Sequence, residues 1–146
     1  MHTEPLTPEL ETESRPELAP ELNTAIAGEC PGACPVRRTA ELIEGKWTTL
    51  IIRDLIGGKK RYSELQRSLS GISPRLLADR LRLLEQRGLV TRTQYPTVPP
   101  TTEYALTALG LELLDVIAAM AKFGLRLAEQ EAAAASSGEA KEPSPV

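Results

Sequence analysis

Between residues 34 and 127, hydrophobic positions recur mostly at helical spacing, and turn residues separate one run from the next. Cys34-Pro35 is typical of an N-cap followed by proline at the first helical position, and Gly45 is expected to stop the helix that begins there. A second helix carries Trp47 and ends at Gly57-Gly58. The pattern therefore predicts a mainly helical body.

Two further helices are predicted around a short turn. Ser63 and Gln66 have the spacing of a capping box, so a short helix is expected from about Ser63 to Leu69. A turn with glycine follows, and Ser73-Pro74 repeats the signature of cap and proline before a longer helix that ends at Gly88. Three leucines at i, i+4 and i+7 form its apolar stripe: Leu77, Leu81 and Leu84. This order is the outline of a helix-turn-helix.

The outward face of the longer helix is basic. If the leucines pack inward, the opposite side carries Arg75, Asp79, Arg82 and Gln86, with Leu76 and Arg80 on the flanks. The residues expected to reach base edges are those of the helix start: Ser73, Arg75, Leu76, Asp79 and Arg80. Pro74 is expected to belong to the same DNA-binding surface. Arg82 and Arg87 lie further along the helix and are better placed for phosphates. The alternative is a solvent-exposed basic helix of a small bundle, and up to this point the two interpretations weigh about equally.

The segment after this helix favours DNA binding. Leu89 to Tyr95 and Thr101 to Leu106 are predicted to be two short strands, joined by a proline-rich tip. A hairpin directly after a recognition helix is a wing, and Arg92 would serve it as a phosphate contact. Lys59, Lys60 and Arg61 supply three charges near the same surface, although such a run alone is more often a solvated turn. The predicted fold is mainly α with a small β-hairpin wing.

Charge divides the chain into three parts. Residues 1–33 carry a net charge of −6, residues 34–127 carry +6, and residues 128–146 carry −3. Both ends are expected to be disordered, with the last helix fraying near Ala135, because prolines recur and apolar residues are sparse. A basic body between acidic tails is expected of a protein that meets phosphates, although a solvated basic surface explains the charge alone equally well.

Several short motifs, in this order and spacing, resemble the HxlR family of bacterial transcriptional regulators. They are Cys34-Pro35-Val36, Leu42-Ile43-Glu44-Gly45-Lys46-Trp47, Arg61-Tyr62-Ser63-Glu64-Leu65, Gly71-Ile72-Ser73-Pro74-Arg75, Leu84-Glu85-Gln86-Arg87-Gly88-Leu89-Val90 and the run from Pro99 to Gly110. The resemblance spans about residues 34 to 124. It implies a homodimeric winged helix-turn-helix, related in fold to the MarR proteins, that binds double-stranded operator DNA as repressor or activator. The sequence departs from the family at Thr101, where an arginine or lysine is usual, so a wing contact to phosphate is expected to be weaker.

The last predicted helix supports the expected dimer. It begins at Thr107, a candidate N-cap, and is apolar on most faces, so one small domain cannot cover it. The candidate interface residues are Leu113, Val116, Ile117, Met120, Phe123 and Leu127. The alternative is an ordinary core helix.

The two cysteines are the candidates for a signal input. Cys34 stands at a helix start beside Arg37 and Arg38, where the positive end of the helix dipole favours the thiolate. The resemblance offers a redox- or electrophile-sensing role for Cys34, and Cys30 would then be a resolving thiol. A cysteine that only caps the helix and packs at the dimer interface is an equally weighted alternative. Four thiolates pooled across a dimer would form a metal site only as a remote possibility.

Other classes of protein are disfavoured. No apolar run approaches the length of a transmembrane helix, and the N-terminus has no signal-peptide pattern, so a cytoplasmic protein is expected. A single histidine and isolated acidic residues offer no catalytic or metal-binding constellation, so neither an enzyme nor a cofactor is expected. The alternative function is a winged-helix module that binds a protein partner without specific DNA binding.

Overall fold

The computed structural model describes residues 19–27 and 34–137. The chain divides into two compact units, one ending at Ile43 and the other beginning at Glu44. Residues 1–18, 28–33 and 138–146 lie outside the described part of the chain. The disorder expected for them and the predicted role of Cys30 therefore stay predictions.

The first unit contains α1 (Pro20–Ala27) and α2 (Pro35–Leu42), which contact each other. Disorder was expected for the whole N-terminal tail, but Pro20–Ala27 form a helix. Pro20 stands at the first helical position, where its missing N–H costs no hydrogen bond, and no proline or glycine follows before Ala27. Cys34 is the N-cap of α2, as predicted. Apolar side chains of both helices line an open groove of about 410 Å³.

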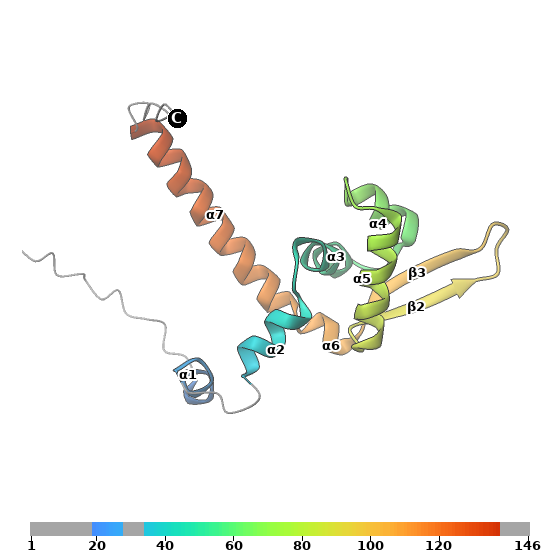
Figure 1. The fold of residues 1–146 in the computed structure, drawn as a ribbon, viewed down its shortest axis with the longest axis horizontal. Coiled ribbons are helices and arrows are strands. Elements are labelled where there is room, and N and C mark those ends of the chain that lie inside the picture. The colour runs from blue at the N-terminus through green and yellow to red at the C-terminus, as the bar shows by residue number, and fades with distance from the viewer. Residues whose placement is uncertain (1–18, 28–33, 138–146) are drawn as a thin grey trace, which may run out of the picture. The chain divides into compact units, whose positions relative to one another are not determined.

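The second unit holds the remaining elements. In chain order these are α3 (Lys46–Ile56), β1 (Lys60–Arg61), α4 (Tyr62–Ser68), α5 (Pro74–Gln86), β2 (Val90–Tyr95), β3 (Thr101–Leu106), α6 (Ala108–Leu111) and α7 (Leu114–Ser137). The sheet is antiparallel, with strand order β1-β3-β2, so β1 adds a strand that the sequence did not predict. Figure 1 shows α4 and α5 beside the β2-β3 hairpin and α7 running away from it. The predicted fold class, mainly α with a small antiparallel wing, is confirmed.

Helices α3, α4 and α5 enclose the core. Leu77, Leu81 and Leu84 of α5 are all 0% exposed, as the predicted stripe requires. They share the core with Ile51, Ile52 and Leu55 of α3, Leu65 of α4 and Tyr104 of β3. Because these apolar side chains are buried, one face of α5 packs against the core and the opposite face is exposed to solvent.

The start of α4 differs from the prediction. The N-cap is Arg61, not Ser63, and the Glu64 side chain accepts a hydrogen bond from the Arg61 backbone N–H at 2.9 Å. The helix therefore begins at Tyr62. Arg61 pairs with Glu103 in the sheet, and this pairing fixes where the strand ends and the helix starts.

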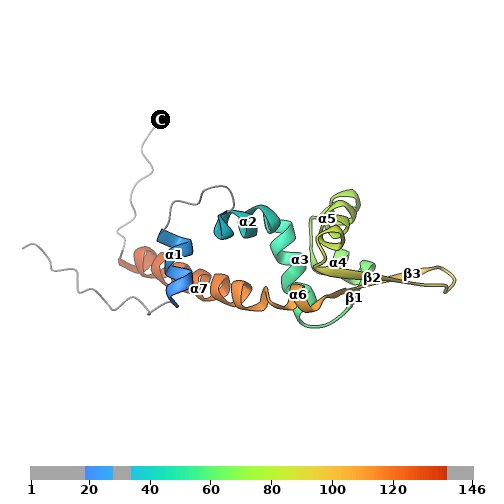
Figure 2. The same ribbon diagram turned by 90° about the horizontal axis from the view of Figure 1, so that it is seen from below.

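The wing strands lie as predicted, to within one residue. Val90 pairs with Leu106 and Tyr95 with Thr101, so the two strands stay in register along their whole length. Figure 2 shows the hairpin reaching beyond α4 and α5. At its tip, the Thr97 hydroxyl donates to the Pro99 carbonyl at 2.8 Å and lies 2.6 Å from the Thr101 hydroxyl. At position 101 the family usually has an arginine or lysine; here the Thr101 hydroxyl contacts Thr97 and holds the two ends of the hairpin tip together.

The predicted last helix is two helices. Thr107 caps α6 as expected, because its hydroxyl accepts from the Gly110 N–H at 3.0 Å. The chain then turns at Glu112 and Leu113 before α7 begins. Leu113 is only 8% exposed, so the turn is the point where the helical segment packs onto the core. Helix α7 continues to Ser137, two residues past the expected fraying at Ala135.

Candidate nucleic-acid interface

Helix α5 presents its start and its outward face to solvent. The Ser73 side chain accepts from the Leu76 N–H at 3.1 Å, which confirms the predicted cap. Arg75, Asp79 and Arg82 are exposed, opposite the buried leucines. The positive end of the helix dipole and an exposed guanidinium therefore share one end of α5, an arrangement suited to nucleic acid.

Charges on the outward face interact with one another. Arg82 Nη1 lies 3.6 Å from Asp79 Oδ1, one turn away along the helix, and both side chains are more than half exposed. Exposed pairs of this kind contribute little stability, so Asp79 can accept from a base instead, and Arg82 can donate to a base or a phosphate.

Two of the predicted base-reading residues lie on the flank of α5. Leu76 and Arg80 are half-buried. Arg80 Nη2 lies 3.7 Å from the point where a Cβ on Gly45 would stand, so its guanidinium reaches back toward the start of α3. Arg80 therefore stands at the border of the outward face, where it also lines a surface hollow together with Asp79 and Arg82.

Tyr62 links the first helix of the motif to the second. Its hydroxyl donates to the Pro74 carbonyl oxygen at 2.8 Å, in the first turn of α5. Burial raises the pKa of the Tyr62 hydroxyl above its usual value of 10.0, and the nearby Tyr104 adds to the rise. The phenol therefore stays protonated and remains a donor at neutral pH. The sequence motif contains Tyr62, but nothing local in the pattern signals this contact.

A polar cleft separates α5 from the sheet. Arg82 and Glu85 line it from the helix, and Arg92 and Tyr104 line it from β2 and β3, around a volume of about 220 Å³. The fold thus brings together two arginines that are separate in sequence and that were both assigned to phosphates. Two guanidinium groups beside one cleft suit a phosphate of the DNA backbone.

The residues of the predicted basic run, Lys59 to Arg61, do not all lie on the same face of the sheet. Lys60 and Arg92 both pair with Tyr104, whereas Arg61 pairs with Glu103. Because neighbouring residues of a strand point to opposite faces, Lys60 lies on the face toward α5 and Arg61 on the outer face. Lys60 lines a second polar cleft with Arg53, Asp54, Glu64 and Ser68.

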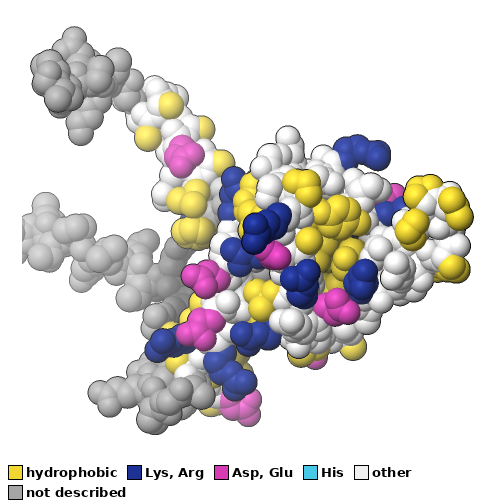
Figure 3. Space-filling model, turned by 45° about the vertical axis from the view of Figure 1, so that its right-hand side comes forward, with side chains coloured by type: hydrophobic (Ala, Val, Ile, Leu, Met, Phe, Trp, Pro, Cys, Tyr) yellow, Lys and Arg dark blue, Asp and Glu magenta, His cyan; other side chains and the backbone are white. Residues whose placement is uncertain are grey.

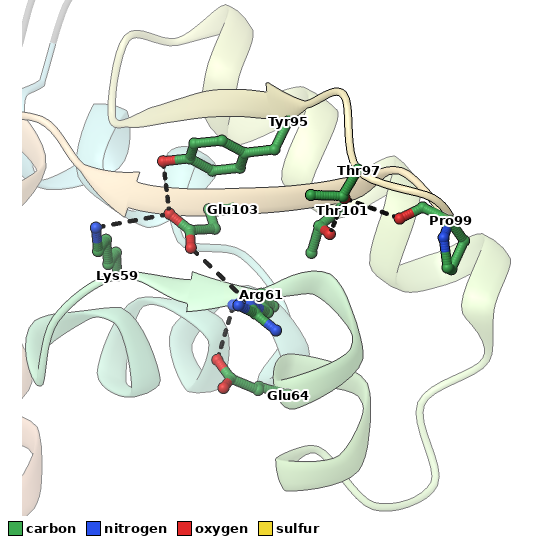
Figure 4. Close-up of polar contacts among 8 residues, drawn as sticks. All are labelled: Lys59, Arg61, Glu64, Tyr95, Thr97, Pro99, Thr101 and Glu103. Atoms are coloured by element: carbon green, nitrogen blue, oxygen red, sulfur yellow. Dashed lines mark hydrogen bonds and ion pairs between the residues drawn. The ribbon is translucent and has the colours of Figure 1, made fainter.

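Glu103 gathers polar groups on the outer face. Lys59 Nζ lies 3.7 Å from Oε2 of Glu103, and Arg61 Nε lies 4.0 Å from Oε1. The Tyr95 hydroxyl donates to Oε2 at 3.0 Å. Figure 4 shows these side chains directed toward Glu103 from both sides of β3. The sequence did not single out Glu103 as a functional residue, since its partners come from distant segments.

The surface mixes both signs of charge. In Figure 3, Lys and Arg side chains are spread over the body, with Asp and Glu between them. Within the described residues, no group of three or more His, Cys, Asp or Glu side chains is placed to hold a metal ion. In the same part of the chain, no helix combines the length and the apolar character needed to span a membrane.

Cys34 lies in the first unit and is half-buried at the start of α2. Of the two arginines expected beside it, Arg37 pairs with Glu41 along the helix, with Nε 2.9 Å from Oε1. Arg38 is exposed. The Arg37 charge is thus partly compensated by Glu41.

Helix α7 exposes large apolar side chains. Phe123 is 65% exposed and Leu125 68%, and Met120 and Leu127 are close to half exposed. Among the candidate interface residues, Val116 and Ile117 are half-buried and Leu113 is buried within the unit itself.

Comparisons with known proteins agree with this architecture. A family model described as an HxlR-like helix-turn-helix matches residues 42–132. An uncharacterised helix-turn-helix-type transcriptional regulator of Synechocystis is 42% identical over 98 residues, which cover 67% of this chain and 73% of the relative.

Two solved structures extend the comparison. One, described as a MarR-family transcriptional regulator from Porphyromonas gingivalis, superposes with a TM-score of 0.64 at 44% identity, covering 67% of this chain and 96% of that one. The redox regulator HypR in its reduced form superposes with a TM-score of 0.61 at 39% identity, covering 63% of this chain and 91% of that one. Because the family model matches more than half of the sequence, the chain belongs to the HxlR-like helix-turn-helix family of transcriptional regulators.

Proposed function

We propose that the protein regulates transcription as a homodimer that inserts α5 of each subunit into the major groove of an inverted-repeat operator. The observation that carries this proposal is the division of α5 into a fully buried leucine stripe and an exposed face with Arg75, Asp79 and Arg82. Arginine pairs bidentately with guanine, and carboxylates accept from cytosine. Two helices related by a two-fold axis read half-sites about 10 bp, or a multiple of that, apart.

The test replaces Arg75 by alanine. We expect operator affinity to fall by about 1–3 kcal/mol with relaxed sequence preference, because a base contact is lost. Arg87→Ala, near the other end of α5, is the matched control, and its effect should be similar for every sequence. Fluorescence anisotropy on the operator and on a scrambled duplex measures both. Unchanged operator affinity in the Arg75 variant would remove the assignment, and binding to no DNA at all would favour the module that binds a protein partner.

We also propose that Cys34 makes operator binding responsive to oxidants or electrophiles. Support comes from the place of Cys34 at the start of α2 and from the similarity to HypR, whose structures include an oxidised form. In the redox case, Cys34 and a second cysteine lose two protons and two electrons to the oxidant and form one disulfide bond. The available partners are Cys30 of either subunit and Cys34 of the other subunit.

The deciding comparison is operator binding by wild type, Cys34→Ser and Cys30→Ser, each with and without a mild oxidant. Wild type is expected to change affinity on oxidation, and Cys34→Ser to keep the reduced behaviour. An identical response of wild type and Cys34→Ser would leave Cys34 as a helix cap.

A further inference from the structure

Glu103 occupies the middle of the sheet on its outer face. It lies on β3 between Arg61 of β1 and Thr93 of β2. Its side chain is 18% exposed, and its carboxylate oxygens face Lys59, Arg61 and the Tyr95 hydroxyl. Tyr95 holds the carboxylate in place from the wing, so its negative charge has a fixed position between the two cations.

The two cations are loosely held. Lys59 and Arg61 have side chains that are 69% and 58% exposed, and their distances to Glu103 are 3.7 and 4.0 Å. Pairs with such exposure and such distances are weak, so a phosphate that approaches can replace the carboxylate. Glu103 itself cannot follow the cations, because it is mostly buried and bound by Tyr95.

The cluster adjoins, along the chain, two parts of the molecule that face DNA in the proposed function: the start of α4 and the wing. Arg61 directly precedes Tyr62, whose hydroxyl contacts the first turn of α5. Glu103 is on the strand that returns from the wing tip. In a helix-turn-helix the first helix crosses the DNA backbone, so a cation at the start of α4 is within reach of phosphate.

We propose that Glu103 competes with DNA phosphates for Lys59 and Arg61 and thereby lowers the affinity of the protein for DNA of any sequence. This inference rests on the proposed function. The carboxylate contacts no base, so it changes general affinity and leaves sequence preference to α5. Electrostatic contacts dominate non-specific binding, so a carboxylate that competes for the cations shortens the time that the regulator stays on non-operator DNA.

Glu103→Gln tests the competition. The amide keeps the shape of the side chain and still accepts from Tyr95, but it has no charge to hold the cations. We expect affinity for the operator and for a scrambled duplex to rise by the same factor, about three- to tenfold at moderate salt. The ratio between the two affinities should stay constant.

Two further proteins make the test specific. In the background of Lys59→Gln and Arg61→Gln, adding Glu103→Gln should change DNA affinity by less than about twofold, because the cations that it would release are absent. Glu112→Gln removes the same charge from an exposed turn between α6 and α7 and should leave affinity near that of wild type. Thermal melting of each protein checks that it is folded.

Different outcomes overturn different statements. Equal or weaker DNA binding by Glu103→Gln would overturn the competition, and so would a rise that persists without Lys59 and Arg61. In both cases wild type still binds the operator, so the proposed function stands. Failure of wild type to bind any duplex, including the DNA that flanks its own gene, would overturn the proposed function and this inference with it.

Discussion

At the scale of single residues, the hydroxyl of Tyr62 has the clearest positioning role. It reaches from α4 to the Pro74 carbonyl and so fixes the first turn of α5 next to Arg75. Because its pKa is raised, the donor is present throughout the neutral range. This contribution to stability is complete below a pH of about 10 and is lost as pH rises through the pKa of the folded protein.

We therefore expect Tyr62→Phe to lower the free energy of unfolding by about 1 kcal/mol, the net worth of one hydrogen bond. Discrimination between operator and scrambled DNA should fall as well, because the start of α5 loses its anchor. Urea denaturation and anisotropy titrations measure the two effects. Tyr95→Phe is the control: it also loses one hydroxyl, but this hydroxyl binds Glu103 of β3 and no residue of α5, so its discrimination should match that of wild type.

The sequence predicts some site residues better than others. Arg75 and Arg82 follow from the helical period once the leucine stripe is recognised, because spacing alone sets their face. Glu103 does not follow, since its role depends on the pairing of β1 with β3. The flank residue Arg80 shows the same limit: its guanidinium lies near Gly45, and the helical period does not predict this contact.

At the scale of elements, Gly110 decides how α6 joins the sheet. A Cβ at this position would overlap the carbonyl oxygen of Leu89 and press on Leu106. The same carbonyl accepts from the Thr107 N–H at 2.9 Å, so it cannot move away freely. The close approach of α6 to the start of β2 therefore requires glycine.

Gly110→Ala is expected to lower the free energy of unfolding by about 1–3 kcal/mol, the usual cost of overpacking. Gly57→Ala is the matched control, because a Cβ there would meet only the Asp54 carbonyl oxygen, at an ordinary 3.7 Å. Alanine at Gly57 should be close to neutral, since the backbone there is right-handed helical and alanine adopts it without strain. Chemical denaturation compares the two, and a stable Gly110→Ala protein would show that α6 can shift without loss.

Local signals account for most element boundaries. The cap at Ser73, the proline after it and the leucine stripe are contiguous, so α5 was predicted in full. The start of α4 was predicted wrongly because two pairs of residues, Ser63 with Gln66 and Arg61 with Glu64, both have the spacing of a cap. The pairing of β1 with β3, which is distant in sequence, favours the cap at Arg61. The break between α6 and α7 has no proline at the turn, and packing of Leu113 into the core produces it.

At the scale of the whole molecule, two α5 helices must be held at a fixed separation to read two half-sites. Helix α7 offers the surface for this, because it runs for 24 residues with none of them buried. Phe123 and Leu125 are about two-thirds exposed, and Met120 and Leu127 are close to half exposed. Apolar surface of this extent is expected to be covered by a second copy of the chain.

Phe123→Glu tests this arrangement with little risk to the fold. Phe123 is 65% exposed in the single chain, so the substitution removes few contacts within it. In a dimer interface the new carboxylate would be buried without a partner, at a cost of several kcal/mol. We expect light scattering to report a monomer and operator affinity to fall toward that for a single half-site.

Gln130→Glu adds the same charge further along α7, at an exposed polar position, and should remain dimeric. A Phe123→Glu protein that stays dimeric would place the interface elsewhere and leave the exposed face of α7 for another partner.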